Sequence, residues 1–177
     1  TYFVDSAQSC AILVREGAGG RTAGRIVEVE AYRGPEDRAA HTAGGRRTAR
    51  NEVMWGAAGK LYVYFTYGMH HCCNVVTRQE GVPEAVLLRA LEPVAGVSVM
   101  QRRRGRTELA PFALARGPGN LCRAMGINRD LDGSDLRHAP TLLEVGKRRL
   151  RTCKARFGLG SRMPLLLALQ HEERGVR

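Results

Sequence analysis

The segment Leu61–Thr77 restricts the fold of this chain more than any other, because it predicts a β-hairpin. Aromatic and β-branched residues dominate Leu61–Tyr67, Gly68 follows, and the segment ends in the mostly apolar run Cys72–Thr77. Such residues favour strands, and a glycine between two strand-like runs is typical of a tight turn. We therefore expect a β-sheet to which this hairpin belongs.

Other strand-like runs outnumber the helical ones. Strands are expected at Ala11–Val14, Gly24–Tyr32, Ala85–Leu91 and Leu165–Leu169, with a glycine-rich turn at 17–20. Between them, the sequence predicts a polar loop over Pro35–Gly45, a helical turn within Arg47–Met54, and short helices at Val97–Arg104 and Leu121–Met125. This pattern predicts an α+β fold in a single domain, residues 1–177, with an antiparallel β core flanked by short helices.

The charge of the chain points to a polyanionic partner. Lys and Arg total 28 against 17 Asp and Glu, which gives a formal net charge of +11. Neutralising phosphates with such charges releases counterions and favours binding to nucleic acid. The alternative is an arginine-rich composition without a partner, since only Lys60, Lys147 and Lys154 are lysines. No apolar run is long enough to span a membrane, so no membrane association is expected.

The cysteines do not form a recognisable framework. There are five, an odd number without paired spacing, which argues against disulfides and for a reducing compartment. The cluster His70-His71-Cys72-Cys73 resembles a metal site, but neighbouring residues on a strand point to opposite faces. We therefore expect no metal there.

Two carboxylates and a tyrosine share one face of the strand Gly24–Tyr32. By alternation, Val27, Val29 and Ala31 face one way, while Glu28, Glu30 and Tyr32 face the other. Such a face is either solvated or part of a polar cleft. Asn74 and Arg89 interrupt otherwise apolar strands, and polar groups in such positions need a partner or a function.

The hairpin is rich in tyrosine. Tyr62 and Tyr64 share one face, whereas Tyr67 has the opposite parity and lies beside Gly68 at the turn. Aromatic residues on strands are more often core than site. An exposed aromatic at a hairpin tip of a basic protein instead indicates insertion between stacked bases.

These residues lie in motifs that strongly resemble the 3-methyladenine (alkylpurine) DNA glycosylases of the alkyladenine type. The matching motifs are Gly-Arg-Ile-Val-Glu-Val-Glu-Ala-Tyr (24–32) with Arg-Gly-Pro-Glu-Asp-Arg-Ala-Ala-His (33–41), Gly-Gly-Arg-Arg-Thr-Ala-Arg-Asn (44–51), Leu-Tyr-Val-Tyr-Phe-Thr-Tyr-Gly-Met (61–69), Val-Leu-Leu-Arg-Ala-Leu-Glu-Pro (86–93) and Gly-Pro-Gly-Asn-Leu-Cys-Arg-Ala-Met-Gly-Ile-Asn (117–128). The resemblance covers most of the chain in order. It implies a curved antiparallel core with a protruding hairpin.

The resemblance also implies roles for individual residues. Glu30 would activate the attacking water, which Arg89 and a backbone carbonyl near Phe157 would help to hold. The flipped base would lie among Tyr32, His41, Tyr64 and Asn74. Tyr67 would fill the gap left in the duplex. Contacts to the DNA are expected from Arg46, Arg47, Arg50, Met69 and Asn120.

The activity implied is excision of alkylated purines from double-stranded DNA, with 3-methyladenine and 7-methylguanine as substrates and hypoxanthine and ethenoadenine as further candidates. Asn74 would discourage normal guanine by crowding its 2-amino group. No lysine lies in these motifs, so the enzyme is expected to be monofunctional and to leave an abasic site. No cofactor and no metal are expected. A monomer is expected, located with DNA in a bacterial cytoplasm or a eukaryotic nucleus.

Three alternatives compete with this interpretation, and one of them, the deaminase, is set aside. A non-catalytic DNA-binding relative of the same fold is one, because relatives continue after Ala155–Gly160 through a Trp-containing segment where this chain has Ser161–Pro164, and its tail also differs. A zinc nucleobase deaminase lacks support, because His41 is followed by Thr42-Ala43 and no Cys-x-x-Cys is present. A ribosome-associated or structural basic protein would make the tyrosines and carboxylates accidental.

Overall fold

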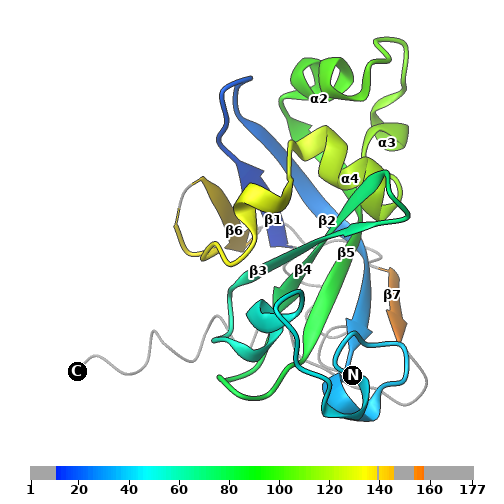
Figure 1. The fold of residues 1–177 in the computed structure, drawn as a ribbon. Coiled ribbons are helices and arrows are strands. Elements are labelled where there is room, and N and C mark those ends of the chain that lie inside the picture. Colours follow the sequence, from blue (N-terminus) through cyan, green and yellow to red (C-terminus); the bar gives the residue numbers. More distant parts are fainter. Residues whose placement is uncertain (1–10, 139, 146–153, 158–177) are drawn as a thin grey trace.

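The fold is taken from a computed structural model, which describes residues 11–138, 140–145 and 154–157 (Figure 1). The strands are β1 (Ala11–Arg15), β2 (Thr22–Tyr32), β3 (Leu61–Thr66), β4 (His70–Val76), β5 (Ala85–Ala95), β6 (Thr141–Val145) and β7 (Lys154–Phe157). The α-helices are α2 (Val97–Arg104), α3 (Pro111–Leu114) and α4 (Pro118–Met125). Single 3₁₀ turns are η2 (Gly34–Glu36), η3 (Ala43–Gly45), η4 (Glu52–Trp55) and η5 (Arg129–Leu131).

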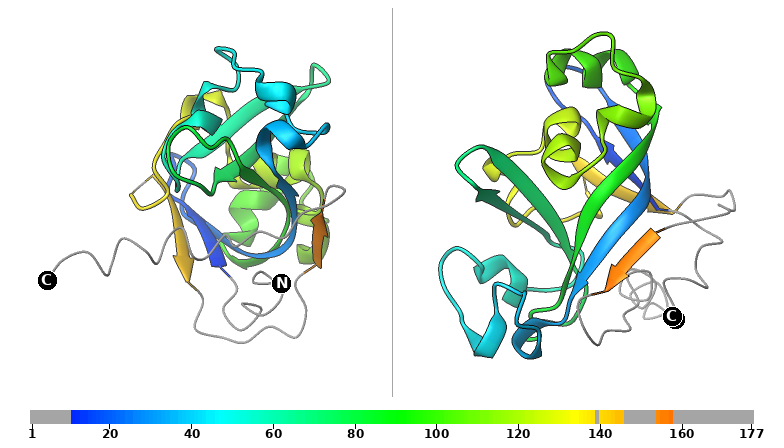
Figure 2. Two further views of the ribbon diagram at one scale, coloured as in Figure 1. Left: turned by 90° about the horizontal axis from the view of Figure 1, so that it is seen from below. Right: turned by 90° about the vertical axis from the view of Figure 1, so that its right-hand side faces the viewer.

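One curved sheet contains all of these strands (Figure 2). Its order is β3-β4-β5-β2-β1-β6, and each of these neighbours is antiparallel. Strand β2 is central: β5 covers one edge, whereas the other edge pairs with β1 over Thr22–Arg25 and with β7 over Glu28–Ala31. The β2–β7 pair is parallel. The expected α+β fold with a curved antiparallel core is confirmed.

The β3–β4 hairpin protrudes from this sheet. Strand β4 pairs with β5 only over Asn74–Val76, so the residues between Thr66 and His70 lie beyond the last contact with the sheet. At the turn, Tyr67 and Gly68 have φ angles of 51° and 66°, and the Met69 N–H donates to the Thr66 carbonyl at 3.2 Å. Two successive positive φ angles match the right-handed twist of a hairpin, and glycine supplies the second without strain.

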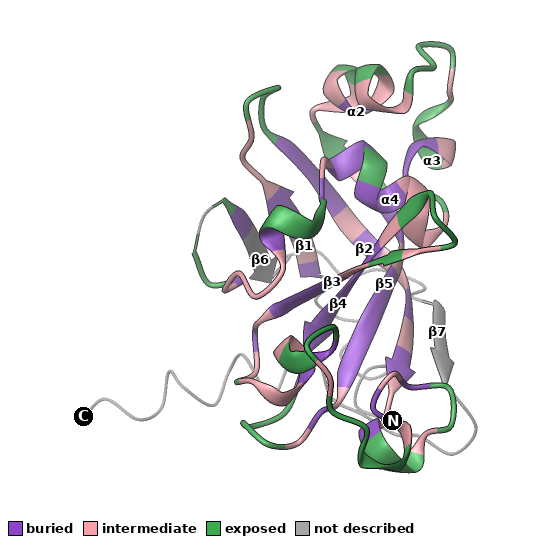
Figure 3. Cartoon of the chain, in the orientation of Figure 1, coloured by how far each residue is buried: buried purple, intermediate pink, exposed green. Residues whose placement is uncertain are grey.

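The core lies between the sheet and the helices (Figure 3). Helix α4 packs against β4 and β5 and buries Leu121, Cys122, Ala124 and Met125. A smaller cluster of Met54, Tyr62, Val76 and Ala85 lies apart from it. Burial of apolar area on both sides of β3 and β4 stabilises the hairpin base, at roughly 25 cal/mol per Å².

The structure corrects several local expectations. Register shifts around Glu28 leave Val27 without a partner on β5, so Ile26 rather than Val27 is buried with Val29 and Ala31. Strands β6 and β7 lie in a region for which the sequence predicted no strand. The strand expected at Leu165–Leu169 lies outside the described residues. Within the described part of the chain, no helix has the length and apolar character that a membrane crossing requires.

Candidate active site

Glu30 lies at the centre of a hydrogen-bonded group on β2 and β5. Arg89 donates from Nη1 to Glu30 Oε2 at 2.7 Å and from Nε to Glu28 Oε1 at 3.1 Å. The Tyr32 hydroxyl donates to the other oxygen of Glu30, Oε1, at 2.9 Å. Both oxygens of the Glu30 carboxylate are therefore oriented by neighbours, and the three charged side chains are each 21–25% exposed.

Irregular strand pairing produces this arrangement. Across the two strands, Glu28 pairs with Ala90 and Val29 with Leu88, which leaves Arg89 without a register partner on β2. Such a bulge turns a side chain away from regular alternation. As a result, the guanidinium lies between two carboxylates that are on the same face of β2.

The pKa directions describe a polar but partly desolvated setting. Burial lowers the pKa of Arg89, but Glu28 and Glu30 outweigh it, and the net pKa is raised. Burial first, then the hydrogen bond and charge of Glu30, raise the pKa of Tyr32 well above its usual value. Tyr32 is therefore a hydrogen-bond donor and Arg89 a cation throughout the physiological pH range.

An aromatic hollow opens beside this group. It measures about 250 Å³ with its open mouth and is lined by Tyr32, Ala39, His41, Met54, Tyr62, Tyr64 and Asn74. The Tyr62 and Tyr64 rings stack at 5.4 Å, and the His41 ring meets Tyr64 edge-on at 4.6 Å. Flat rings at these angles form walls against which a planar base can stack.

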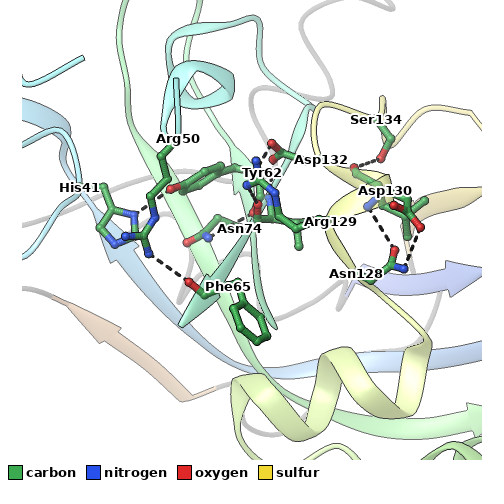
Figure 4. Close-up of polar contacts among 12 residues, drawn as sticks. His41, Arg50, Tyr62, Phe65, Asn74, Asn128, Arg129, Asp130, Asp132 and Ser134 are labelled. Carbon is green, nitrogen blue, oxygen red and sulfur yellow. Dashed lines mark hydrogen bonds and ion pairs between the residues drawn. The ribbon is translucent and has the colours of Figure 1, made fainter. Parts of the chain in front are cut away.

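His41 is held in place by Tyr62 (Figure 4). His41 Nδ1 lies 2.8 Å from the Tyr62 hydroxyl. Burial, followed by the charges of Arg50 and Arg46, lowers the pKa of His41. Burial raises the pKa of Tyr62 to about 12. A neutral imidazole and a protonated tyrosine therefore face the hollow at neutral pH.

Asn74 is 2% exposed, and its side-chain amide donates to the Tyr62 carbonyl at 3.3 Å. This bond fixes the amide at the hollow, where a substituent on a bound base would meet it.

The two cysteines before Asn74 point in opposite directions. Cys72 interacts with Tyr64, whereas Cys73 interacts with Cys122 on α4. The described residues contain no group of His, Cys, Asp or Glu able to hold a metal ion.

A second hollow adjoins the first across His41. It measures about 680 Å³ with its open mouth, and its lining includes Arg38, Arg46 and Arg50 but no carboxylate. Its shape depends on Asn51, which is 2% exposed. The Asn51 amide donates to the carbonyls of His41 and Arg46, both at 2.9 Å, and its oxygen accepts from the Thr48 N–H at 2.8 Å.

The three arginines predicted to contact DNA differ in their surroundings. Arg46 is exposed at the second hollow. Arg50 lies 5.5 Å over the Tyr64 ring and donates to the Phe65 carbonyl at 3.2 Å. Arg47 forms a two-pronged ion pair with Glu52, at 3.0 and 2.5 Å, and stacks over Trp55. Of the three, Arg46 is the one whose side chain has neither an ion pair nor a cation–π contact with the described residues.

The hairpin tip exposes apolar side chains to solvent. Tyr67 is 88% exposed and Met69 is 68% exposed, which excludes Tyr67 as a core residue. Next to the tip, the His70 ring lies against Gly119 of α4, where a Cβ atom would come within 2.9 Å of it. Asn120, one residue further, donates to the Arg116 carbonyl at 2.8 Å. The hairpin and the start of α4 thus form one surface.

The structure brings most of the predicted site together. Glu30, Arg89, Tyr32, His41, Tyr64 and Asn74 lie around the aromatic hollow and its adjoining carboxylates, whereas Tyr67, Met69 and Asn120 lie at the hairpin tip and α4. The backbone of Phe157 pairs with Ala31, next to Glu30. Sequence reasoning missed Tyr62 and Asn51. The shared parity of Tyr62 and Tyr64 could have indicated the first, but no local signal marked the second.

Comparison with known proteins places the family model and three relatives in agreement with one another. The family model for methylpurine-DNA glycosylase matches residues 10–167. A protein of Clostridium acetobutylicum is 49% identical over 142 residues, which are 77% of this chain and 69% of the relative. Relatives from Desulfitobacterium hafniense and Methanoculleus marisnigri are 50% and 56% identical, over 71% and 74% of this chain and 64% and 65% of their own lengths. All three names give 3-methyladenine DNA glycosylase as a provisional activity. The matches therefore span about two thirds of these relatives.

Proposed function

The chain belongs to the methylpurine-DNA glycosylase family, and on this premise we propose that it is a monofunctional DNA glycosylase that releases alkylated purines from double-stranded DNA. The observation that carries the proposal is a carboxylate, Glu30, oriented by Arg89 and Tyr32 beside a hollow with aromatic walls. The proposed substrates are 3-methyladenine and 7-methylguanine, with hypoxanthine and ethenoadenine as further candidates.

In the proposed reaction, the damaged nucleotide leaves the duplex and its base enters the aromatic hollow. Alkylation at N3 or N7 makes the purine cationic, and a cation is attracted to the faces of Tyr32 and Tyr64. A neutral His41 adds no positive charge that would repel it. Asn74, fixed at the hollow, would exclude normal guanine by crowding its 2-amino group.

Hydrolysis then breaks the bond between C1′ of the sugar and the purine nitrogen. The electron pair of that bond stays with the base, so a cationic purine leaves as a neutral one. Water attacks C1′ and gives its proton to Glu30, whose negative charge also stabilises the oxocarbenium-like sugar. Each carboxylate oxygen has two acceptor sites, so the bonds from Arg89 and Tyr32 leave room for this water.

The absence of a lysine among the described residues that line the hollow agrees with a water nucleophile and an abasic product. The other contacts to DNA would come from Tyr67 and Met69 at the tip, from Arg46 and Arg50 at the second hollow, and from Asn120 on α4. Arg47 would contribute less, because Glu52 already neutralises it.

The test is a base-release assay on duplexes that each carry one candidate lesion, followed by strand cleavage at abasic sites. We expect the wild type to release alkylated purines. Glu30→Gln, which keeps the shape of the side chain but removes the proton acceptor, is expected to lose roughly 10²–10⁴-fold in rate while it still binds the duplex. Glu92→Gln is the matched control, since Glu92 lies on β5 in an ion pair with Arg25. Binding of the duplexes without release of any base by the wild type would favour the non-catalytic alternative.

A further inference from the structure

Strand β3, which carries Tyr62 and Tyr64 and leads to Tyr67, is an edge strand of the sheet. Its outward backbone groups are those of Leu61, Val63 and Phe65. At Leu61 they are satisfied by backbone: the N–H donates to the Ser134 carbonyl, and the carbonyl accepts from the Gly133 N–H, both at 2.8 Å. The segment after η5 therefore covers the start of this edge in place of another strand.

At Val63 the outward backbone groups are bound by two side chains, Arg129 and Asp132, which Figure 4 labels. The Val63 N–H donates to Asp132 Oδ1 at 2.8 Å, and the Val63 carbonyl accepts from Arg129 Nη1 at 2.5 Å. The same two side chains pair with each other at 3.3 Å. Together they replace both hydrogen bonds that a neighbouring strand would make.

Between Val63 and the hairpin tip, the outward backbone groups of β3 are held by fewer hydrogen bonds. The Phe65 carbonyl accepts from the exposed Arg50, and Phe65 itself is 46% exposed. Among the described residues, Val63 is thus the outermost position of β3 at which both outward backbone groups are hydrogen-bonded. Tyr62 and Tyr64, which flank it, point to the other face and line the aromatic hollow.

We propose that Arg129 and Asp132 are positioning residues for base release: by holding Val63, they set the hairpin so that Tyr64 in the hollow and Tyr67 at the tip engage one duplex at the same time. Neither side chain lines the aromatic hollow. The distance between hollow and tip must match the geometry of a flipped nucleotide and the gap that it leaves. A displacement of about 1 Å far from the reacting atoms can reduce a rate by about 10²-fold.

The experiment compares duplex and single-stranded substrates that carry the same lesion, in single-turnover reactions with saturating enzyme. Arg129→Met removes the donor but keeps the stem of the side chain. We expect it to lower release from the duplex by roughly 5- to 50-fold and release from the single strand much less, because a single strand leaves no gap for Tyr67 to fill. Arg78→Met is the matched control: Arg78 is 46% exposed against 45% for Arg129 and pairs with Glu84 instead of with the hairpin.

Two variants at Asp132 separate positioning from folding. Asp132→Asn keeps an acceptor for the Val63 N–H and is expected to retain most of the wild-type rate of base release from the duplex. Asp132→Leu removes the acceptor and is expected to lose most of that rate. If the leucine variant does not fold, Arg129→Met decides the question. Equal losses on both substrates, or no loss with Arg129→Met, would overturn the proposal.

The inference rests on the proposed function, so one measurement is independent of base release. A 2-aminopurine next to the lesion reports unstacking when the protein binds the duplex. We expect wild type and Arg78→Met to increase its fluorescence and Arg129→Met to increase it less, at equal saturation. If the wild type releases no base, the proposed function is wrong, and this fluorescence comparison still decides the role of Arg129.

Discussion

Tyr67 offers the clearest separation of function from stability, because its side chain is 88% exposed. Truncation to alanine removes almost no buried area, and the melting temperature is expected to change by no more than about 2–4 °C, the shift that 1 kcal/mol produces in a chain of this size. Tyr67→Gly tests the same separation of function from stability more strictly. The residue has a φ of 51°, a conformation that costs an L-residue roughly 1–2 kcal/mol, so glycine is expected to be at least as stable as alanine there.

The effect on DNA is expected to be much larger. A base–aromatic stack contributes about 1–3 kcal/mol, so both variants are expected to lose roughly 5- to 150-fold in release from duplex DNA, converted with RT of about 0.6 kcal/mol. The assay measures single-turnover release from a duplex and from the corresponding single strand, beside the thermal melt. A lowered melting temperature with matched losses on both substrates would refute the wedge role, because that pattern belongs to a structural side chain.

Three further outcomes are expected. Burial, together with the charges of Arg50 and Arg46, lowers the pKa of His41, so as pH falls below about 6.5 the unfolded chain takes up a proton before the folded chain does. Urea titrations should therefore show the wild type losing stability more steeply than His41→Gln over that range, and parallel curves would contradict the lowered pKa. Arg46→Gln should reduce the slope of log affinity for DNA against log salt concentration by about 0.9, and Arg47→Gln should reduce it less, because Arg47 is ion-paired. Fluorescence anisotropy measures both slopes. Equal slopes for the two variants would contradict the assignment of Arg46 as the stronger phosphate contact. Asn51→Ala should lower the free energy of unfolding, measured by urea titration, by about 2–4 kcal/mol, because three hydrogen bonds are lost at a buried site. A change below about 0.5 kcal/mol would show that these bonds do not stabilise the loop around Asn51.

Much of the fold was predictable from the sequence because the relevant signals are local. Alternation and aromatic content identified β2, β3, β4 and most of β5, but no such pattern marked β6 or β7. The glycine after Tyr67 indicated the hairpin turn, which two positive φ angles then form. Helix α2 occupies the predicted range Val97–Arg104. These features depend on a few neighbouring residues, whose φ and ψ preferences are set by their own side chains.

For the site, the sequence determined which side chains are available, and the tertiary structure decided which of them meet. The alternation of β2 placed Glu28, Glu30 and Tyr32 on one face, but it could not pair Glu30 with Arg89, which lies 59 residues further along the chain. That contact depends on a register shift between β2 and β5, and the register depends on how whole strands pair. The same holds for Asp132 and Val63, which are 69 residues apart. A polar side chain in a sequence shows that a partner is needed, whereas only the assembled sheet, in which distant strands are hydrogen-bonded, determines which residue that partner is.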